Sequence, residues 1–419
     1  MAPRAAKSFV VVRANRRRQG AADQPCEKRS PWTGSTTLLS TGAGGYAAKH
    51  IIRELVVGRA RLALAGRNTA TIERNIADVA GAERIPIIRC LPENAQSVAR
   101  KTRLLLNCAG PYIFSGEPIV RACIDTGTHY MDITGETFFI EQIRKKYDEE
   151  ARRRGVYVVN CCGFDSVPAD IGVEHLKAVL GASAEITSVM RLRNTYLNRA
   201  TYDSLIFGLQ NAGEMKRLRN PQRRTGGRRP RKCFYNDKTG SYNVMFMGTD
   251  PSVVRRTQED MQKRGLGCAR YEAYLDVGGL SNLLAVAMCF LVVMLLSKFG
   301  LGRRILLRYP SLFTCGRVKP DGPSEDVLRK SSFEILFFGH SPESGKRKRM
   351  VVSGPDPGYH TTAICISQAA LCLLDTLESR GKEGLPCEGG VLTPGSVFHG
   401  TDIVTRLHGK GIRFEILSD

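Results

Sequence analysis

The chain has 419 residues, 42% hydrophobic and 24% charged, a composition typical of a globular protein and not of a disordered one. This length exceeds one ordinary hydrophobic core and predicts two domains. A net charge of +22 indicates an anionic partner, such as cofactor phosphate, lipid headgroup or nucleic acid. Because neither zinc-finger spacing nor an aromatic RNA-binding motif is present, nucleic acid is the least supported, and we expect none.

Neither cysteine nor histidine forms a pattern that holds a metal. The 13 cysteines are an odd number, are scattered and contain no C-x-x-C pair, which argues against a disulfide framework and a zinc site. The 7 histidines are scattered as well. We therefore expect free thiols, a reducing compartment and no metal ion.

Residues 1–35 differ in composition from the rest of the chain. Before the first acidic residue, Asp23, stand only basic charges: Arg4, Lys7, Arg13, Arg16, Arg17 and Arg18. An Arg-rich, acid-poor start is typical of a mitochondrial targeting segment. Because serine is sparse and the amphipathic pattern is poor, we favour a disordered basic tail or an aberrant start of the chain, and exclude this segment from the fold.

From Thr36 the pattern alternates between short apolar runs and helical spacing, which is typical of βαβ units. We expect strands, with helices between them, over 36–40, 61–65, 85–90, 104–109, 128–133 and 156–160. The series predicts an α/β fold, with a Rossmann-type doubly wound parallel sheet forming a dinucleotide-binding domain over 36–170.

A glycine-rich turn follows the first predicted strand. It reads as G-x-G-x-x-A through Gly42 and Gly44, or as G-x-x-G-x-x-A through Gly42, Gly45 and Ala48. A helix that begins at Gly45 would direct its positive N-terminal end at a phosphate. We predict a nucleotide at Gly42, Gly44, Gly45 and Tyr46; a glycine turn without a ligand is the alternative.

The residue that ends the second predicted strand distinguishes between the two nicotinamide cofactors. An acidic residue there would bind the ribose 2′-hydroxyl of NAD, whereas an arginine would bind the 2′-phosphate of NADP. The position is Arg67, beside Asn68. We therefore predict NADP (NADPH), with an ordinary exposed arginine as the alternative.

Three loops follow the fourth, fifth and sixth strands: 107–112, 132–136 and 163–170. Ligands of open α/β sheets bind beyond the carboxyl ends of the strands, so we expect the loops to converge. In the first loop we predict that Asn107, Gly110 and Pro111 contact the cofactor. Each loop has an alternative interpretation as turn chemistry or as a helix cap.

Several motifs, in order, resemble the saccharopine dehydrogenase-like oxidoreductases. They are Ala65-Gly-Arg67, Asn107-Cys-Ala-Gly-Pro-Tyr112, Gly116-Glu-Pro118, Tyr130-Met-Asp-Ile-Thr-Gly-Glu136, Gly163-Phe-Asp-Ser-Val-Pro-Ala-Asp170, Met247-Gly-Thr-Asp250, Ser252 to Gln258 and Gly389 to Gly395. The resemblance spans about 36–417. It implies an NADP-type Rossmann domain, a mixed second domain, and a return of the C-terminal segment to the first domain.

The resemblance also links the chain to lipid-related enoyl reductases and to animal proteins found on lipid droplets and membranes. The sequence departs from the family pattern at two places, where Ala48 replaces the third turn glycine and Ala200-Thr201 replaces a Gly-Thr pair. The first departure puts the tightness of cofactor binding in question.

The second domain is expected over 171–380, as an α+β domain for substrate and dimerisation, with 381–419 returning to the first domain. Its predicted strands are 185–193, 333–339 and 348–353. Nine basic residues and no acid fill 216–232. We interpret this run as an exposed loop; contact with anionic lipid headgroups is the alternative.

Residues 277–297 carry no charge, and about 14 of them form a strongly apolar run that is followed at once by basic residues. This pattern predicts that 277–310 embeds in a membrane or lipid-droplet surface. A buried core or dimer helix is the alternative, and a homodimer is a further expectation. We expect a lipid droplet or the cytosolic face of an intracellular membrane, with the mitochondrion as the alternative.

A short-chain dehydrogenase needs a tyrosine with a lysine four residues on, and no tyrosine here has one. The candidates for the proton donor are therefore the other groups in the predicted loops: Tyr112, Asp132, Glu136 and Asp165. We rank Tyr112 and Asp165 first as catalytic residues. The sequence thus predicts an NADP-dependent oxidoreductase acting on a lipid-like or hydrophobic substrate at a membrane surface. A catalytically silent membrane scaffold that keeps the fold is the alternative.

Overall fold

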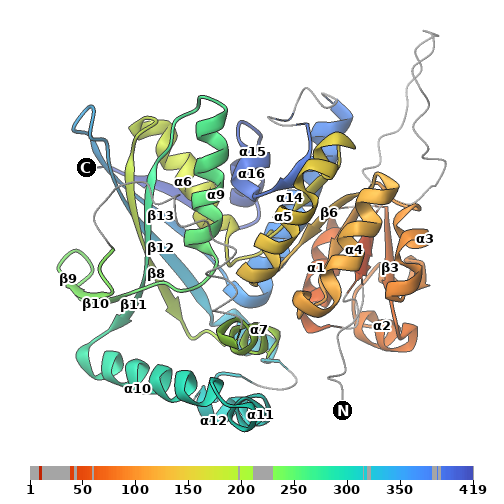
Figure 1. Cartoon of the computed structure of the whole chain (residues 1–419), viewed down its shortest axis with the longest axis horizontal. Coiled ribbons are helices and arrows are strands. Elements are labelled where there is room, and N and C mark those ends of the chain that lie inside the picture. The colour runs from red at the N-terminus through yellow and green to blue at the C-terminus, as the bar shows by residue number, and fades with distance from the viewer. Residues whose placement is uncertain are drawn as a thin grey trace. The chain divides into compact units, whose positions relative to one another are not determined.

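The computed structural model describes residues 9–11, 38–41, 45–58, 61–196, 199–210, 230–314, 316–318, 322–379, 385 and 388–418. Two compact units make up the chain (Figure 1). The first comprises Met1–Thr134, Ile143–Asn160 and Ile366–Leu392, and the second comprises Gly135–Gln142, Cys161–Cys365 and Thr393–Asp419. The greater part of the predicted basic loop lies outside the described residues, as do Gly42 and Gly44.

The first unit is built on an eight-stranded sheet in the order β14-β7-β6-β5-β2-β1-β3-β4. All of its pairs are parallel except those of β1. The strands are β1 (Phe9–Val11), β2 (Leu38–Thr41), β3 (Leu62–Gly66), β4 (Ile87–Arg89), β5 (Leu104–Asn107), β6 (His129–Asp132), β7 (Tyr157–Val159) and β14 (Gly390–Leu392). A strand is present at each of the positions predicted between Thr36 and Asn160, which confirms the Rossmann-type sheet.

Helices connect these strands and cover the sheet. Strands β3 and β5 are buried along their whole length, as expected of parallel strands that helices cover on both faces. The helices that lie wholly or partly in this unit are α1 (Tyr46–Val57), α2 (Thr69–Ile76), α3 (Ala95–Ala99), α4 (Tyr112–Thr126), α5 (Thr137–Arg153) and α14 (Thr362–Ser379), with short 3-10 turns at Ala82–Arg84 and Pro92–Asn94.

Strand β1 lies in the segment that we excluded from the fold. It runs antiparallel to its neighbours, with Phe9 opposite Thr41 on β2 and opposite Ala65 on β3. The expectation of a tail wholly outside the fold was therefore wrong at these three residues. A run of Phe and Val has strong strand propensity, but here it is short and lies within an arginine-rich segment.

The predicted domain boundaries differ from the observed ones at both ends. The N-terminal part of the first unit ends at Asn160 and not at residue 170. Helix α14, which was expected in the second domain, lies for its greater part in the first unit. The C-terminal segment divides: β14 pairs in parallel with β7, whereas β15 (Arg413–Leu417) pairs with β13 of the second unit. Of that segment, only the part up to Leu392 belongs to the first unit.

The second unit is built on a seven-stranded mixed sheet in the order β15-β13-β12-β8-β11-β10-β9. Along β12, Phe333, Ile335 and Phe337 are buried and alternate with half-buried residues, so one face of the sheet is covered. The strands are β8 (Glu185–Arg193), β9 (Cys233–Asn236), β10 (Ser241–Met245), β11 (Arg270–Gly278), β12 (Ser332–His340), β13 (Arg347–Gly354) and β15.

Helices α6 (Val167–Leu180) and α9 (Asp250–Lys263) pack on that covered face and against each other. A Cβ atom at Gly172 of α6 would lie 2.8 Å from the Phe337 ring, so the missing side chain lets α6 approach β12 closely. The sequence analysis did not predict β9, β10, β11 or α9. The remaining helices of the unit are α7 (Arg199–Gln210), α10 (Leu280–Ser297), α11 (Gly300–Arg308), α12 (Pro310–Phe313), α13 (Glu325–Arg329), the π-turn Pro357–Thr361, α15 (Pro394–Phe398) and α16 (Ile403–His408).

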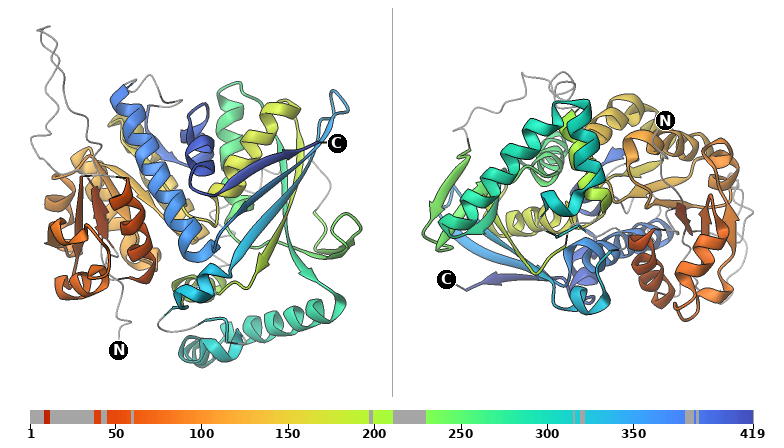
Figure 2. Two further views of the ribbon diagram at one scale, coloured as in Figure 1. Left: turned by 180° about the vertical axis from the view of Figure 1, so that it is seen from behind. Right: turned by 90° about the horizontal axis from the view of Figure 1, so that it is seen from below.

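The uncharged apolar segment is helix α10, which runs from the end of β11 to the edge of α11 (Figures 1 and 2). It begins at Leu280 and not at residue 277, because Val277 and Gly278 still belong to β11. Among the described residues it is the one helix that has the length and composition of a membrane span. Ser297 is its one buried residue, so α10 is not the core helix that we considered as an alternative.

The corner between α10 and α11 depends on the absence of a side chain at Gly302. A Cβ atom there would lie 2.2 Å from the Leu296 carbonyl oxygen, whereas the nearest atom to a Cβ at Gly300 is 3.9 Å away, on Arg303. We expect Gly302→Ala to force α11 off α10 at a cost of about 1–3 kcal/mol. Hydrogen exchange of the α11 amides should then accelerate about tenfold or more. Gly300→Ala, two residues away, is the matched control, and equal acceleration in both variants would contradict this account.

Candidate active site

The first helix of the Rossmann sheet begins where a nucleotide phosphate would need it. Gly45 is the N-cap of α1, in an extended conformation, and Tyr46 is the first helical residue. Ala48, the departure from the family pattern, is 1% exposed within the first turn, so a methyl group is accommodated there. A helix start that follows a strand and has glycine as its cap fits a pyrophosphate group.

Arg67 directly follows β3 at its carboxyl end, and its side chain is exposed. The next residue, Asn68, caps α2, because its Oδ1 accepts a hydrogen bond of 3.1 Å from the Thr71 amide. Asn68 therefore has a structural role, while the guanidinium of Arg67 faces solvent. This arrangement fits a 2′-phosphate, and the assignment of Arg67 to NADP stays a prediction of ours.

A buried chain of polar side chains joins the carboxyl ends of β5, β6 and β7. Asn107 Nδ2 donates to the Tyr130 hydroxyl at 3.0 Å, and that hydroxyl donates to Asp132 Oδ2 at 3.0 Å. Asn160 Nδ2 donates to the same oxygen at 2.7 Å, and the Thr134 amide donates to Asp132 Oδ1 at 3.1 Å. Both oxygens of Asp132 are thus occupied in fixing the strand ends, which argues against Asp132 as the proton donor.

Tyr112, one of the two preferred donors, is buried at the start of α4. Its hydroxyl donates to the backbone carbonyl of Asn107 at 2.8 Å, and the side chain is 4% exposed. The bond spans the loop that carries Gly110 and Pro111, whose peptide bond is cis. This geometry favours a structural role for Tyr112, which holds the loop against the end of β5.

Asp165, the other preferred donor, belongs to the second unit and lies just before α6. Its backbone carbonyl accepts hydrogen bonds from the Ser166 hydroxyl and, at 2.6 Å, from the Thr249 hydroxyl. A Cβ atom at Gly135 would lie 3.1 Å from Asp165 Oδ2, so glycine leaves room for the carboxyl group. Burial raises the pKa of Asp165, and a carboxyl that keeps its proton to higher pH is suited to donate it.

Two further buried carboxyl groups lie near Asp165. Asp170 Oδ2 accepts hydrogen bonds from the Thr257 hydroxyl at 2.9 Å and from the Gly395 amide at 2.7 Å. Burial raises the pKa of Asp170 to about 7. At Asp250, burial raises the pKa well above its usual range, and the charges of Asp165 and Asp170 raise it further. Within the described residues, Asp170 Oδ1 and Asp250 Oδ1 have no hydrogen-bond partner.

The sequence analysis missed this cluster of acids. Asp170 was predicted only as the last residue of the loop 163–170, with a helix cap as the alternative, and Asp250 only as part of a motif of the resemblance. Asp250 follows Thr249, whose hydroxyl contacts the Asp165 backbone, so the two motifs meet in the second unit. No periodicity could have indicated that contact, because 84 residues separate the two groups.

Side chains of the C-terminal segment extend the cluster. The Thr257 and Thr393 hydroxyl oxygens lie 2.6 Å apart, and Thr393 also bonds Ser396 at 2.8 Å. The Ser396 hydroxyl then donates to Asp260 at 3.1 Å. This row of hydroxyl groups fastens α15 to α9 and thereby holds the Gly395 amide on Asp170.

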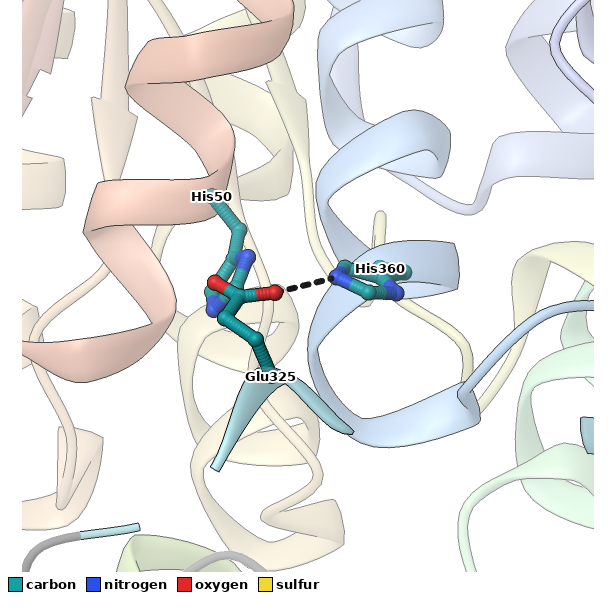
Figure 3. A group of neighbouring side chains, drawn as sticks. All are labelled: His50, Glu325 and His360. Atoms are coloured by element: carbon teal, nitrogen blue, oxygen red, sulfur yellow. Dashed lines mark ion pairs between the residues drawn. The ribbon is translucent and has the colours of Figure 1, made fainter. Parts of the chain in front are cut away.

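The two remaining candidate groups are also in the second unit. Glu136 accepts a hydrogen bond of 2.8 Å from the Ser204 hydroxyl of α7. Glu325 and His360 form an ion pair of 3.6 Å, which Figure 3 marks with a dashed line.

Comparison with known proteins places this geometry in a family. A family profile described as "Saccharopine dehydrogenase NADP binding domain" matches residues 38–159. A saccharopine dehydrogenase-like oxidoreductase of Rattus norvegicus is 32% identical over 421 residues, which cover 91% of this chain and 97% of the relative. The chain belongs to the saccharopine dehydrogenase-like oxidoreductase family. This membership confirms the predicted family, the oxidoreductase class and NADP as the cofactor of the first unit.

Two other relatives bear names that state a location. A saccharopine dehydrogenase-like oxidoreductase of Arabidopsis thaliana, named as mitochondrial, is 32% identical over 91% of this chain and 96% of its own length. A Caenorhabditis elegans relative, named "Lipid droplet localized protein", is 30% identical over 90% of this chain and 97% of its own length. Both locations were among those considered from the sequence.

The buried carboxyl of Asp170 makes a prediction about pH. Its pKa rises from 3.8 to about 7 on folding, so between these values the folded state holds a proton that the unfolded state releases. Stability from this group is therefore complete below about pH 4 and is lost as pH rises through 7, by about 4 kcal/mol in all. Asp170→Asn cannot lose a proton.

We expect the variant to gain stability relative to the natural protein as pH rises from 5 to 8. Urea unfolding at both pH values measures the difference. A difference that stays constant, or that shrinks with rising pH, would contradict the raised pKa. Asp148→Asn, which exchanges a partly exposed carboxyl on α5, is the control.

Proposed function

We propose that this protein is an NADPH-dependent reductase that acts on a lipid-like or hydrophobic substrate at a membrane or lipid-droplet surface. The family supplies the oxidoreductase class and the cofactor. The observation that carries the rest is helix α10, an apolar helix of 18 residues that the described fold leaves almost wholly exposed. Such a patch needs an apolar environment.

In this proposal the nucleotide is held by the first unit. The turn through Gly42, Gly44, Gly45 and Tyr46 binds the pyrophosphate, and Arg67 binds the 2′-phosphate. The loop after β5 contributes Asn107, Gly110 and Pro111, with Asn107 and the Tyr112 hydroxyl fixing its shape. Backbone groups presented by a rigid loop bind a phosphate or an amide without paying much ordering entropy.

Asp165 of the second unit is the proposed proton donor. Bound NADPH supplies a hydride to carbon, and the reduction is completed when a protonated group delivers H⁺ to the atom that gains negative charge. Burial, which raises the pKa of Asp165, favours that protonated form. At the neighbouring Asp250, the charges of Asp165 and Asp170 raise the pKa as well, because a second negative charge nearby opposes ionisation.

The proposed location follows from the same helix. A lipid droplet or the cytosolic face of a membrane would cover α10, and the name of the Caenorhabditis elegans relative supports the droplet. The name of the Arabidopsis thaliana relative supports the mitochondrion as the alternative. Self-association through α10 into a homodimer is a competing use of this surface.

The alternative function is a lipid-surface scaffold that keeps the fold without turnover. Ala48 in place of a turn glycine motivates it, although the buried position of Ala48 in α1 shows that the helix tolerates the methyl group. Binding of NADPH without oxidation across a panel of hydrophobic enoyl and carbonyl compounds would favour the scaffold.

The proposed cofactor site predicts a nucleotide preference. Arg67→Asp should weaken NADPH binding at least tenfold, because a charge-assisted bond to the 2′-phosphate is replaced by repulsion. Affinity for NADH, which lacks that phosphate, should change less than threefold. Fluorescence titration measures both constants. Arg84→Asp, at another exposed arginine, is the control, and an equal loss for both nucleotides would refute the assignment.

The proposed donor predicts a loss in turnover without a loss in cofactor binding. Asp165→Asn should lower kcat about 100-fold or more, the usual contribution of a general acid, while the Kd for NADPH stays unchanged. In the natural protein kcat should fall as pH rises through the raised pKa of Asp165. Tyr112→Phe tests the other candidate. A large loss there, together with full activity of Asp165→Asn, would transfer the role to Tyr112.

A further inference from the structure

Helix α10 is fastened to the second unit at its N-terminal end. Strand β11 leads directly into it through Gly278 and Gly279. Asp276 fixes this junction, because its Oδ2 accepts from Arg191 Nε of β8 at 2.7 Å and its Oδ1 accepts from the Gly278 amide at 2.9 Å. The start of α10 is therefore tied to the interior of the seven-stranded sheet.

The other end of α10 is fastened to the same unit through α11. Arg303 donates to the Ser297 carbonyl at 3.0 Å, which fixes the corner between the two helices. A small apolar core then joins α11 to α7 through Tyr202, Ile206, Leu306 and Val318, with Val293 and Leu296 of α10 packed against it. Figures 1 and 2 show α10 running from β11 to this point beside α7.

These two attachments decide how α10 can enter a lipid layer. Its 18 residues are about 27 Å long at ~1.5 Å per residue, close to the thickness of a bilayer core. A crossing helix would place the end of β11 and the α7 contact on opposite sides of the membrane. Both belong to one folded unit, so crossing would require that unit to come apart.

We propose that α10 and α11 lie in the plane of a single leaflet of an anionic phospholipid surface, with both ends of α10 on the same side. This inference rests on the proposed lipid-surface function and adds the depth, the orientation and the headgroup. A lipid droplet is bounded by one phospholipid leaflet, which cannot hold a spanning helix. An in-plane helix fits that leaflet and a bilayer equally well.

The outward face of α10 is an unbroken apolar stripe. Leu280, Leu284, Met288, Leu291 and Leu295 are 54%, 62%, 62%, 53% and 50% exposed. Their spacing of three or four residues places them on one side of a helix, while Val293 and Leu296 face the apolar core with α7. The stripe is the part of the surface that enters the acyl layer.

Helix α11 carries the charge that selects the headgroup. From Val277 to Pro320 the sequence contains no acid, and its basic residues are Lys298, Arg303, Arg304, Arg308, Arg317 and Lys319. On α11, Leu301 and Ile305 are 70% and 37% exposed, and Arg304 and Arg308 are exposed with them. Apolar and basic side chains that share one face suit the headgroup boundary, where the arginines pair with anionic lipids.

The depth of α10 can be measured with single tryptophans. The chain has one tryptophan, Trp32, so Trp32→Phe provides a background for Leu284→Trp, Met288→Trp and Leu295→Trp, examined one at a time. The full-length protein is bound to vesicles of 70% phosphatidylcholine and 30% phosphatidylserine that carry brominated lipids at graded depths. We expect all three probes at one shallow depth, about 5–10 Å into the headgroup and acyl boundary. A Met288 probe several ångströms deeper than the other two would show a spanning helix and overturn the proposal.

The headgroup is tested by charge reversal on α11. Arg304→Glu combined with Arg308→Glu should weaken binding to these vesicles at least tenfold in a flotation assay. Arg84→Glu combined with Arg413→Glu changes the net charge equally at two exposed sites on other elements and should change binding less than twofold. Equal losses in the two double variants would overturn the role of α11.

The outcomes separate this inference from the proposed function. Flotation with a deep Met288 probe overturns the in-plane arrangement and leaves the lipid surface standing. Absence of flotation with vesicles and with triolein droplets coated by the same lipids overturns both, as does a soluble dimer in which α10 is protected from hydrogen exchange. Binding of NADPH would remain measurable in each case, because the first unit does not contain α10.

Discussion

A buried carboxyl group must either find hydrogen-bond donors or keep its proton, and the described structure depends on this constraint in both units. Asp132 finds donors: three groups from two strands and a loop occupy its oxygens and lock the carboxyl ends of β5, β6 and β7. Asp170 and Asp250 each keep one oxygen without a partner among the described residues. Aspartate therefore fixes strand ends in the first unit, whereas in the second unit burial raises the pKa of Asp170 and Asp250.

This difference separates structural from chemical candidates. Tyr112 and Asp132 are held by neighbours within the first unit, and their contacts explain why the loop after β5 has one shape. The backbone carbonyl of Asp165 accepts hydrogen bonds from two hydroxyl groups, and burial raises the pKa of its carboxyl group. A firmly placed acid with a raised pKa has the properties that a proton donor requires.

Apolar side chains at the surface are subject to a second constraint, because a large exposed apolar patch is unfavourable in water. Helix α10 presents an apolar stripe to solvent although its two ends are tightly fixed, by Asp276 at one end and by the core around Tyr202 at the other. Fixing both ends of an exposed apolar helix has a cost unless another phase covers it. The basic residues that follow, with a net charge of +22 for the chain, are the reason why we propose an anionic lipid surface as that phase.

The sequence by itself determined the Rossmann sheet, the family, NADP and the presence of a long uncharged apolar segment. Each of these depends on local information: strand and helix periodicity, a glycine turn, one arginine after a strand, and a long run without charge. Strand β1 was not predicted, because basic residues surround a short Phe-Val run. The start of α10 was predicted three residues too early, because β11 ends in uncharged residues that continue the apolar pattern of the helix.

Only the tertiary structure decided which buried acids have hydrogen-bond partners, and that α10 is exposed while both of its ends are held by one unit. The Asp132 network and the contact of Thr249 with Asp165 join groups that are distant in sequence. The division of the C-terminal segment between two sheets depends on strand pairing. The in-plane arrangement that we propose rests on the fact that β11 and α7 belong to one unit. Such contacts leave no periodic signal, since long-range packing and not local propensity selects them.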